Sequence, residues 1–153
     1  MADKDHQSQQ NGRGANGRVI VTYGRSIMAL MIAQSLGRRG VEVIGADSVG
    51  MTVLSFSKFV EKTVTYTSLQ EDEEQFISSL EKIIIDNKPD DDRPYILMPV
   101  YKENRIIAKH KDRLAKHIIV ASPSSESIQQ IYPKDSFADT VKELNVASPL
   151  TVM

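Results

Sequence analysis

The first residues whose types and spacing suggest chemistry are Gly24, Arg25 and Ser26, which follow the apolar run Arg18–Tyr23. A glycine lets a ligand approach the backbone closely, and the amides that begin a following helix carry a local positive potential. Arg25 adds a fixed positive charge suited to a carboxylate or a phosphate. A dinucleotide site normally needs three glycines in such a turn, and here the second and third are absent. The turn therefore either contacts a small anion or only connects a strand to a helix.

Asp47, followed by Ser48, stands at the end of a second apolar run, Val41–Ala46. In a dinucleotide enzyme, an acid at this place holds a ribose hydroxyl. The other reading is an aspartate that starts a turn through its own side chain.

Two further polar groups follow apolar runs or precede a helix. Glu103, Asn104 and Arg105 come just after the run that ends at Val100, where they can meet a small substrate or supply the first-turn charges of a helix. Lys134, next to Asp135, precedes the last helical pattern. Its ammonium can reach an anionic ligand, or it is an ordinary surface lysine.

No catalytic residue and no metal site is predicted. His110 and His117 are seven residues apart with no cysteine anywhere in the chain, which is a poor pattern for zinc. The acidic run at 90–92 lies in a proline-flanked loop and is expected to be solvated. Serine-hydrolase, P-loop and zinc-protease patterns do not occur.

Apolar periodicity predicts the elements that position these residues. Short β-branched runs predict strands, and apolar residues at helical spacing predict the helices between them. The expected strands are 18–23, 41–46, 58–66, 95–100 and 117–122, and the expected helices are 26–38, 68–88, 103–114, 124–131 and 134–144. Strands that alternate with helices in this way predict an α/β fold with an open, mostly parallel sheet and helices on both faces.

Three local details accompany this prediction. The helix at 26–38 is apolar around most of its circumference, which predicts that it is covered on several sides. Ser68 and Glu71 have the spacing of a capping box for the next helix, and Asn145 is suited to a left-handed C-cap.

Composition bounds the class of protein. The chain has 153 residues, 41% hydrophobic residues, a formal net charge of −1 and no cysteine. Interspersed charges offer no broad basic field to nucleic acid or to a membrane surface, and no signal peptide or membrane span is evident. We expect a cytoplasmic protein with a disordered leader at 1–17, followed by one domain at 18–151.

The order of features resembles a known family. The segments "RVIVTYGRSIMALMIAQSLGRRGVEVIGADS", "FVEKTVTY", "YILMPVYKEN", "AKHKDRL" and "YPKDSFADTVKELNVASPLTV" look like the N-terminal domain of ATP-grasp ligases. This pre-ATP-grasp, or biotin-carboxylase-N-terminal-like, domain has a Rossmann-like fold. It precedes the ATP-binding module in carbamoyl phosphate synthase, biotin carboxylase and many carboxylate–amine ligases.

The resemblance implies a function for the larger protein. Members of the family use ATP and magnesium to activate a carboxylate or bicarbonate as an acyl phosphate, which an amine-type nucleophile then attacks. The ATP-grasp module would lie beyond Met153, so this chain alone is expected to be inactive and to bind no cofactor tightly. The implied partners are the downstream ATP-grasp domain and a small carboxylate substrate, and a homodimer is left open.

The resemblance also implies roles for particular residues. Gly24, Arg25 and Ser26 match the turn that lines the substrate side of the cleft, and Glu103 matches an acidic position that faces it. Lys134 matches a lysine that approaches the ATP phosphates in some members, although proline occupies the preceding position, where an acid is usual.

Two alternatives remain at this stage. The chain could be a dinucleotide (NAD or NADP)-binding domain of an oxidoreductase or regulator, as the βαβ start and Asp47 suggest. It could also be a receiver-like module that binds a partner without catalysis, which would need an acidic pocket of strand-end aspartates.

Overall fold

The computed structural model describes residues 15–132 and 134–147, and it contains a five-stranded sheet in which every strand pair is parallel. The strand order is β3-β2-β1-β4-β5, so the chain starts in the middle of the sheet and builds outward to both sides. The strands are β1 (Arg18–Val21), β2 (Glu42–Asp47), β3 (Lys62–Thr65), β4 (Tyr95–Met98) and β5 (Ile119–Val120). The predicted α/β class and parallel sheet are confirmed.

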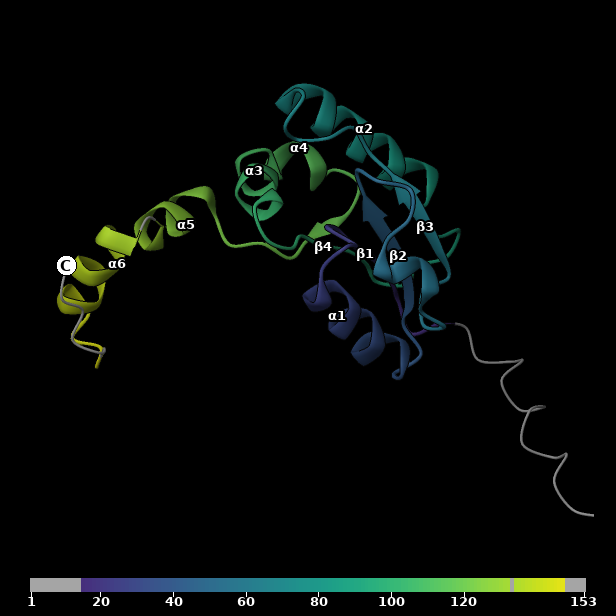
Figure 1. Cartoon of the computed structure of the whole chain (residues 1–153), viewed down its shortest axis with the longest axis horizontal. Coiled ribbons are helices and arrows are strands. Elements are labelled where there is room, and N and C mark those ends of the chain that lie inside the picture. Colours follow the sequence, from purple (N-terminus) through teal and green to yellow (C-terminus); the bar gives the residue numbers. More distant parts are fainter. Residues whose placement is uncertain (1–14, 133, 148–153) are drawn as a thin grey trace, which may run out of the picture.

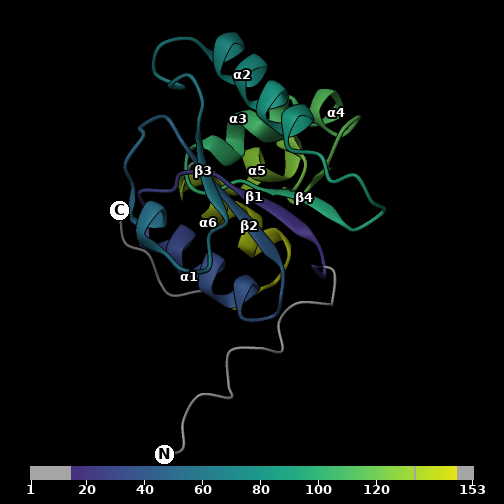
Figure 2. The ribbon, with the colours of Figure 1, turned by 90° about the vertical axis from the view of Figure 1, so that its right-hand side faces the viewer.

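Helices cover both faces of the sheet, as predicted. Figures 1 and 2 show α1 on one face and α2, α3 and α4 on the other. The helices are α1 (Ile27–Gly37), the 3-10 helix η1 (Val53–Phe56), α2 (Glu73–Asp86), α3 (Glu103–Lys109), α4 (Lys111–Leu114), α5 (Ser125–Ile131) and α6 (Lys134–Glu143).

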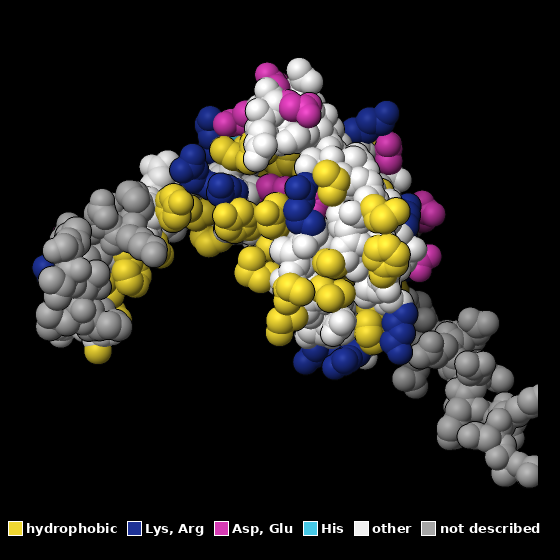
Figure 3. All heavy atoms as spheres, viewed as in Figure 1, with side chains coloured by type: hydrophobic (Ala, Val, Ile, Leu, Met, Phe, Trp, Pro, Cys, Tyr) yellow, Lys and Arg dark blue, Asp and Glu magenta, His cyan; other side chains and the backbone are white. Residues whose placement is uncertain are grey.

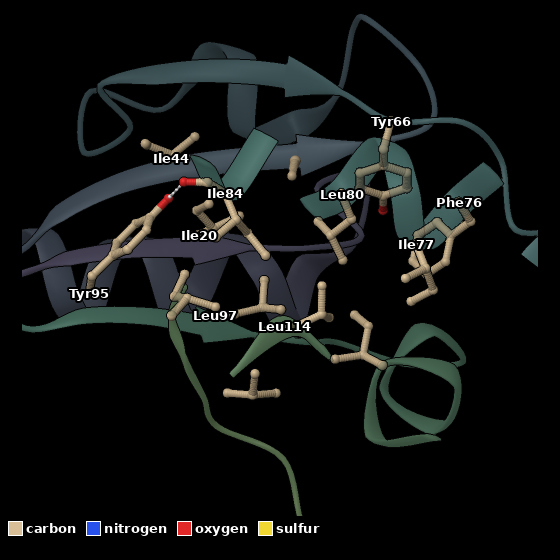
Figure 4. Close-up of a cluster of buried hydrophobic side chains, with 14 residues drawn as sticks. Ile20, Ile44, Tyr66, Phe76, Ile77, Leu80, Ile84, Tyr95, Leu97 and Leu114 are labelled. Carbon is tan, nitrogen blue, oxygen red and sulfur yellow. Dashed lines mark hydrogen bonds between the residues drawn. The ribbon is translucent and has the colours of Figure 1, made fainter. Parts of the chain in front are cut away.

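The core is divided by the sheet into two apolar layers. Alternate residues of a strand point to opposite faces, so Ile20 packs under α2 while Val19 and Val21 pack under α1. Figure 4 shows the larger layer, in which Phe76 and Leu80 of α2 lie over the strands. These layers fix the sheet, and with it the positions at which its strands end.

Helix α1 differs from the prediction that it is covered on several sides. Only Ala29 and Ala33 are buried, whereas Ile27, Met28 and Met31 are more than half exposed. Figure 3 shows apolar side chains gathered on this part of the surface. The sequence pattern reports that a face is apolar but not whether this chain supplies the atoms that cover it.

The start of α2 also differs from the prediction. Asp72, not Ser68, is the N-cap, and its side chain accepts a 2.7 Å hydrogen bond from the amide of Gln75. Ser68 instead lies in a preceding turn, where its carbonyl accepts from the amide of Glu71. Asn145 has a φ of 51°, so the predicted left-handed conformation after α6 is confirmed.

The ends of the chain are described in part. Of the predicted leader, residues 1–14 lie outside the described residues, while Asn16 and Gly17 form backbone hydrogen bonds with Gly40 and Glu42. At the other end, α5 and α6 extend from the body of the domain (Figure 1). In the described parts, 15–132 and 134–147, no helix has the length and apolarity to cross a membrane.

Candidate functional site

The carboxyl ends of β1 and β4 lie side by side at the centre of the sheet. Val21 of β1 pairs with Met98 of β4, while the next strand in sequence, β2, lies on the other side of β1. In open parallel sheets, ligands bind beyond the strand ends at this kind of switch in strand order. One residue beyond Val21, the hydroxyl of buried Thr22 accepts a 3.1 Å hydrogen bond from the amide of Val100 and ties the two strand exits together.

Tyr23 and Tyr101 each follow one of the residues in that tie. Both have left-handed backbones, with φ of 55° and 61°, which are rare for large side chains. Their rings stack with centroids 5.1 Å apart. Strained backbone of this kind persists only where surrounding contacts enforce it, and it concentrates at functional sites.

Arg25 is held by the carboxylate of Asp47 at the end of β2. Its backbone amide donates to Asp47 Oδ2 at 2.9 Å, its Nε donates to both carboxylate oxygens at 3.1 Å, and its Nη2 forms an ion pair with Oδ1. Nη2 also donates to Ser48 Oγ at 2.7 Å. Nη1 takes part in none of these bonds, and the side chain remains 42% exposed. The guanidinium is therefore fixed in orientation, while the side chain as a whole stays partly exposed.

The ion pair has a clear electrostatic signature. The hydrogen bond to Asp47 raises the pKa of Arg25. Burial alone raises the pKa of Asp47, but the hydrogen bonds and charge of Arg25 outweigh it, so the pKa of Asp47 is lowered. Both groups are charged near neutral pH, and the carboxylate that the dinucleotide reading assigned to a ribose is already occupied by Arg25.

Gly24 and Ser26 shape the turn around Arg25. Gly24 is buried, and a Cβ added to it would lie 3.2 Å from side-chain atoms of Thr52 and Leu54, so its small size serves close packing. The hydroxyl of Ser26 caps α1 by accepting from the amide of Ala29 at 3.1 Å. Arg25 is thus the member of the predicted trio whose side chain extends to the surface.

Glu103 lies inside the domain, at the first position of α3. It is 6% exposed, its Oε1 accepts a 2.5 Å hydrogen bond from the hydroxyl of Tyr66, and its buried Oε2 has no hydrogen-bond partner among the described residues. Burial raises the pKa of Glu103, and the hydroxyls of Thr22 and Tyr66 offset only part of this effect. The Tyr66 oxygen also accepts from the amide of Tyr23 at 3.2 Å. Glu103 is therefore linked through the Tyr66 hydroxyl to the backbone of Tyr23, at the start of the turn after β1.

The other predicted positions lie away from this cluster or outside the description. Lys134 begins α6, but its side chain lies outside the described residues. Asn104 accepts a 2.6 Å hydrogen bond from Ser122 and so joins α3 to the end of β5. His110 and His117 contact Glu73 and Glu81, and the described residues contain no group of three or more ligand-type side chains placed to hold a metal ion.

The sequence reasoning missed Tyr23, Tyr101 and Tyr66, which build most of the centre of this site. A signal was present in the sequence, because "VTYG" and "PVYK" place a tyrosine two residues after the end of β1 and three residues after the end of β4. Recognising it requires knowing that these two strands are neighbours, which only the topology provides.

Comparison with solved structures identifies the fold at this point. L-amino acid ligase from Bacillus licheniformis matches over 90% of this chain and 32% of its own, with a TM-score of 0.64 and 14% identity. N5-carboxyaminoimidazole synthetase from Staphylococcus aureus, complexed with ADP, matches over 86% and 30%, with a TM-score of 0.56 and 14% identity. Urea carboxylase from Kluyveromyces lactis matches over 90% of this chain and 12% of its own, with a TM-score of 0.56 and 14% identity.

The fold is shared with ATP-grasp enzymes. The expected likeness to one domain of these ligases is confirmed at the level of fold, and this chain spans about a third or less of each of them. No family model matches the sequence, and no curated protein matches it either. At 14% identity, the likeness supports a shared architecture only, so the roles of individual residues must be argued from the geometry of this chain.

Proposed function

We propose that this chain is the N-terminal, substrate-side domain of an ATP-grasp ligase that activates a carboxylate or bicarbonate as an acyl phosphate for attack by an amine-type nucleophile. The observation that carries the proposal is the match of nine-tenths of the chain to a part of several ligases. The polar and aromatic cluster beyond β1 and β4 supports it, since this is where such sheets bind ligands.

Arg25 is the residue proposed to contact the carboxylate. Nη1, which takes no part in the bonds to Asp47 and Ser48, can donate to an anion, and Asp47 holds the guanidinium in place so that little side-chain entropy is lost on binding. Gly24 and Ser26 contribute by shaping the turn. Glu103 contributes from within, through Tyr66, to the position of Tyr23.

ATP and magnesium are proposed to be held by a downstream ATP-grasp domain, with one contact from Lys134. The described residues of this chain do not fit a triphosphate site by themselves. Leu54 and Thr52 cover Gly24, and Asp47 is paired with Arg25. Acidic residues grouped to hold a metal ion are not found in the described part of the chain. The chain alone is accordingly expected to form no ADP.

The nucleotide-binding alternative has less support from the geometry. A ribose-binding acid must offer free carboxylate oxygens, but both oxygens of Asp47 accept from Arg25, and Oδ1 also accepts from the amide of Val49 at 3.3 Å. Titration of the chain with NAD and NADP is expected to give no saturable binding at micromolar concentration.

The direct test is to sequence the transcript beyond codon 153 and to assay the encoded polypeptide for ADP release. We expect a continuing reading frame of about 200 residues, the size of a further domain, and ADP release that requires both a carboxylate and an amine. A stop codon at that point, or saturable NAD binding, would overturn the proposal.

A further inference from the structure

The two stacked tyrosines carry a cation at each end. The Arg25 guanidinium carbon lies 5.3 Å from the ring centroid of Tyr23, and the Lys102 ammonium lies 5.5 Å from that of Tyr101. Tyr101 is 54% exposed, although it packs against Tyr23. The surface therefore presents aromatic carbon between two positive charges.

The arrangement is held from beneath by several independent contacts. Thr22 bonds Val100, which places the following tyrosines next to each other. Tyr66 accepts from the amide of Tyr23, and Asp47 holds Arg25. These contacts explain how two left-handed tyrosines persist, but they leave an outer ring and two cations facing the surface.

An exposed ring edge beside two cations selects for a particular chemistry. Tyr23 stacks on the Tyr101 ring and the Lys102 ammonium lies over it, so an aromatic ring of a ligand can meet the Tyr101 edge, a contact that favours planar over saturated groups. The cations Arg25 and Lys102 favour an anionic group on the same ligand and disfavour a cationic ligand. Neutral nucleosides would gain the contact with the ring edge but not the attraction to the cations.

We infer that the Tyr23–Tyr101 pair binds the body of an aromatic carboxylate whose carboxyl group lies toward Arg25. The inference deepens the proposed function, on which it rests for the location of the substrate, by naming an aromatic acid as the substrate class. Tyr101 and Lys102 then set specificity, while Arg25 contacts the group that is activated.

The test uses the 153-residue chain, labelled with ¹⁵N and titrated separately with phenylacetate, cyclohexylacetate and adenosine. Because the proposed downstream domain would supply the other side of the site, this chain should bind the acid weakly, with a dissociation constant on the order of millimolar. We expect phenylacetate to shift the amides of residues 22–26 and 100–103 and to bind about threefold or more tighter than cyclohexylacetate and adenosine. Adenosine binding as tightly as phenylacetate, or shifts spread over the whole surface, would overturn the inference.

Variants separate binding from folding. Tyr101→Gly removes the ring but suits a φ of 61°, so the fold should be kept while phenylacetate binding weakens about three- to tenfold. Lys102→Gln should weaken it about threefold. Matched controls are Tyr132→Gly, an exposed tyrosine elsewhere, and Lys58→Gln, whose ammonium lies 5.3 Å from the Phe59 ring. Unchanged binding in Tyr101→Gly would overturn the inference.

The outcome can be told apart from failure of the proposed function. If the chain binds aromatic acids but its gene encodes no downstream ATP-grasp domain, the binding inference is supported and the proposed ligase function is contradicted. If ADP release depends on a carboxylate but shows no preference for aromatic acids, the proposed ligase function is supported and the aromatic substrate class is contradicted.

Discussion

Ion pairs hold both the amino ends and the carboxyl ends of the central strands, but the acidic residues of these pairs differ in how deeply they are buried. At the amino end, Glu42 accepts from Arg18 at 2.9 Å and from Arg93 at 3.3 Å, and the side chains are about one-fifth exposed. At the carboxyl end, Asp47 is almost fully buried under Arg25.

Left-handed tyrosine backbones and one buried carboxyl oxygen without a partner mark the carboxyl end, among the described residues. Glu103 and the two left-handed tyrosines next to the sheet lie at the carboxyl end. The amino end has buried polar atoms without a described partner too, Arg18 Nε and Asn87 Oδ1. Its ion pairs are about one-fifth exposed, and the tyrosine there, Tyr95, is not among the described residues with a left-handed backbone. Strained backbone persists where other contacts hold it and is common at functional sites, so the two left-handed tyrosines favour the carboxyl end as the proposed site.

The largest expected difference between the ends comes from removing an acid. Asp47→Ala should lower the free energy of unfolding by about 3 kcal/mol, because it leaves the Arg25 amide and guanidinium without their acceptor in a partly buried place. Glu42→Ala should cost about 1 kcal/mol. Urea denaturation of both variants measures this, and equal losses would contradict the distinction.

A pair of buried tyrosines sharpens the comparison. Tyr66→Phe should cost about 2 kcal/mol, because the hydroxyl both donates to Glu103 and accepts from Tyr23. Tyr95→Phe, nearer the amino end, loses one 2.8 Å hydrogen bond to the carbonyl of Ile84 and should cost about 1 kcal/mol (Figure 4). Thermal or urea unfolding measures the two losses. A larger loss of unfolding free energy in Tyr95→Phe than in Tyr66→Phe would contradict this prediction.

The smallest expected effect is a pH dependence at Glu103. Burial raises its pKa in the folded state, so its contribution is fully present below the ordinary value of 4.5 and is lost as pH rises through the folded-state pKa. Glu103→Gln should therefore be more stable than the parent near neutral pH, by about 1 kcal/mol, and should lose this advantage in acid.

The control for this prediction is Asp47, whose lowered pKa acts in the opposite direction. Its contribution is present above the ordinary value of 3.8 and is lost only as pH falls below it. Stability curves between about pH 4 and 8, taken by urea titration, separate the two groups. A Glu103→Gln variant with the same pH profile as the parent would show that folding does not raise the pKa of Glu103.

The sequence predicted the architecture because apolar runs and helical spacing report burial directly. It also predicted Arg25 and Glu103 as residues at the carboxyl edge, since each follows a strand. It could not predict that Glu103 turns inward, that Asp47 is paired with Arg25, or that Tyr23 meets Tyr101. Those facts depend on which strands are neighbours and on side-chain packing across 22 to 78 residues of sequence.

The most direct test of the central claim compares an arginine from each end of the sheet in the polypeptide encoded by the complete reading frame. Carboxylate-dependent ADP release should fall about tenfold or more in kcat/KM for Arg25→Gln, because a charge-assisted contact to the carboxylate is lost. Arg93→Gln, at the amino end, should leave it unchanged. Equal loss in both variants, or no loss in Arg25→Gln, would contradict a carboxylate site at the exit of β1.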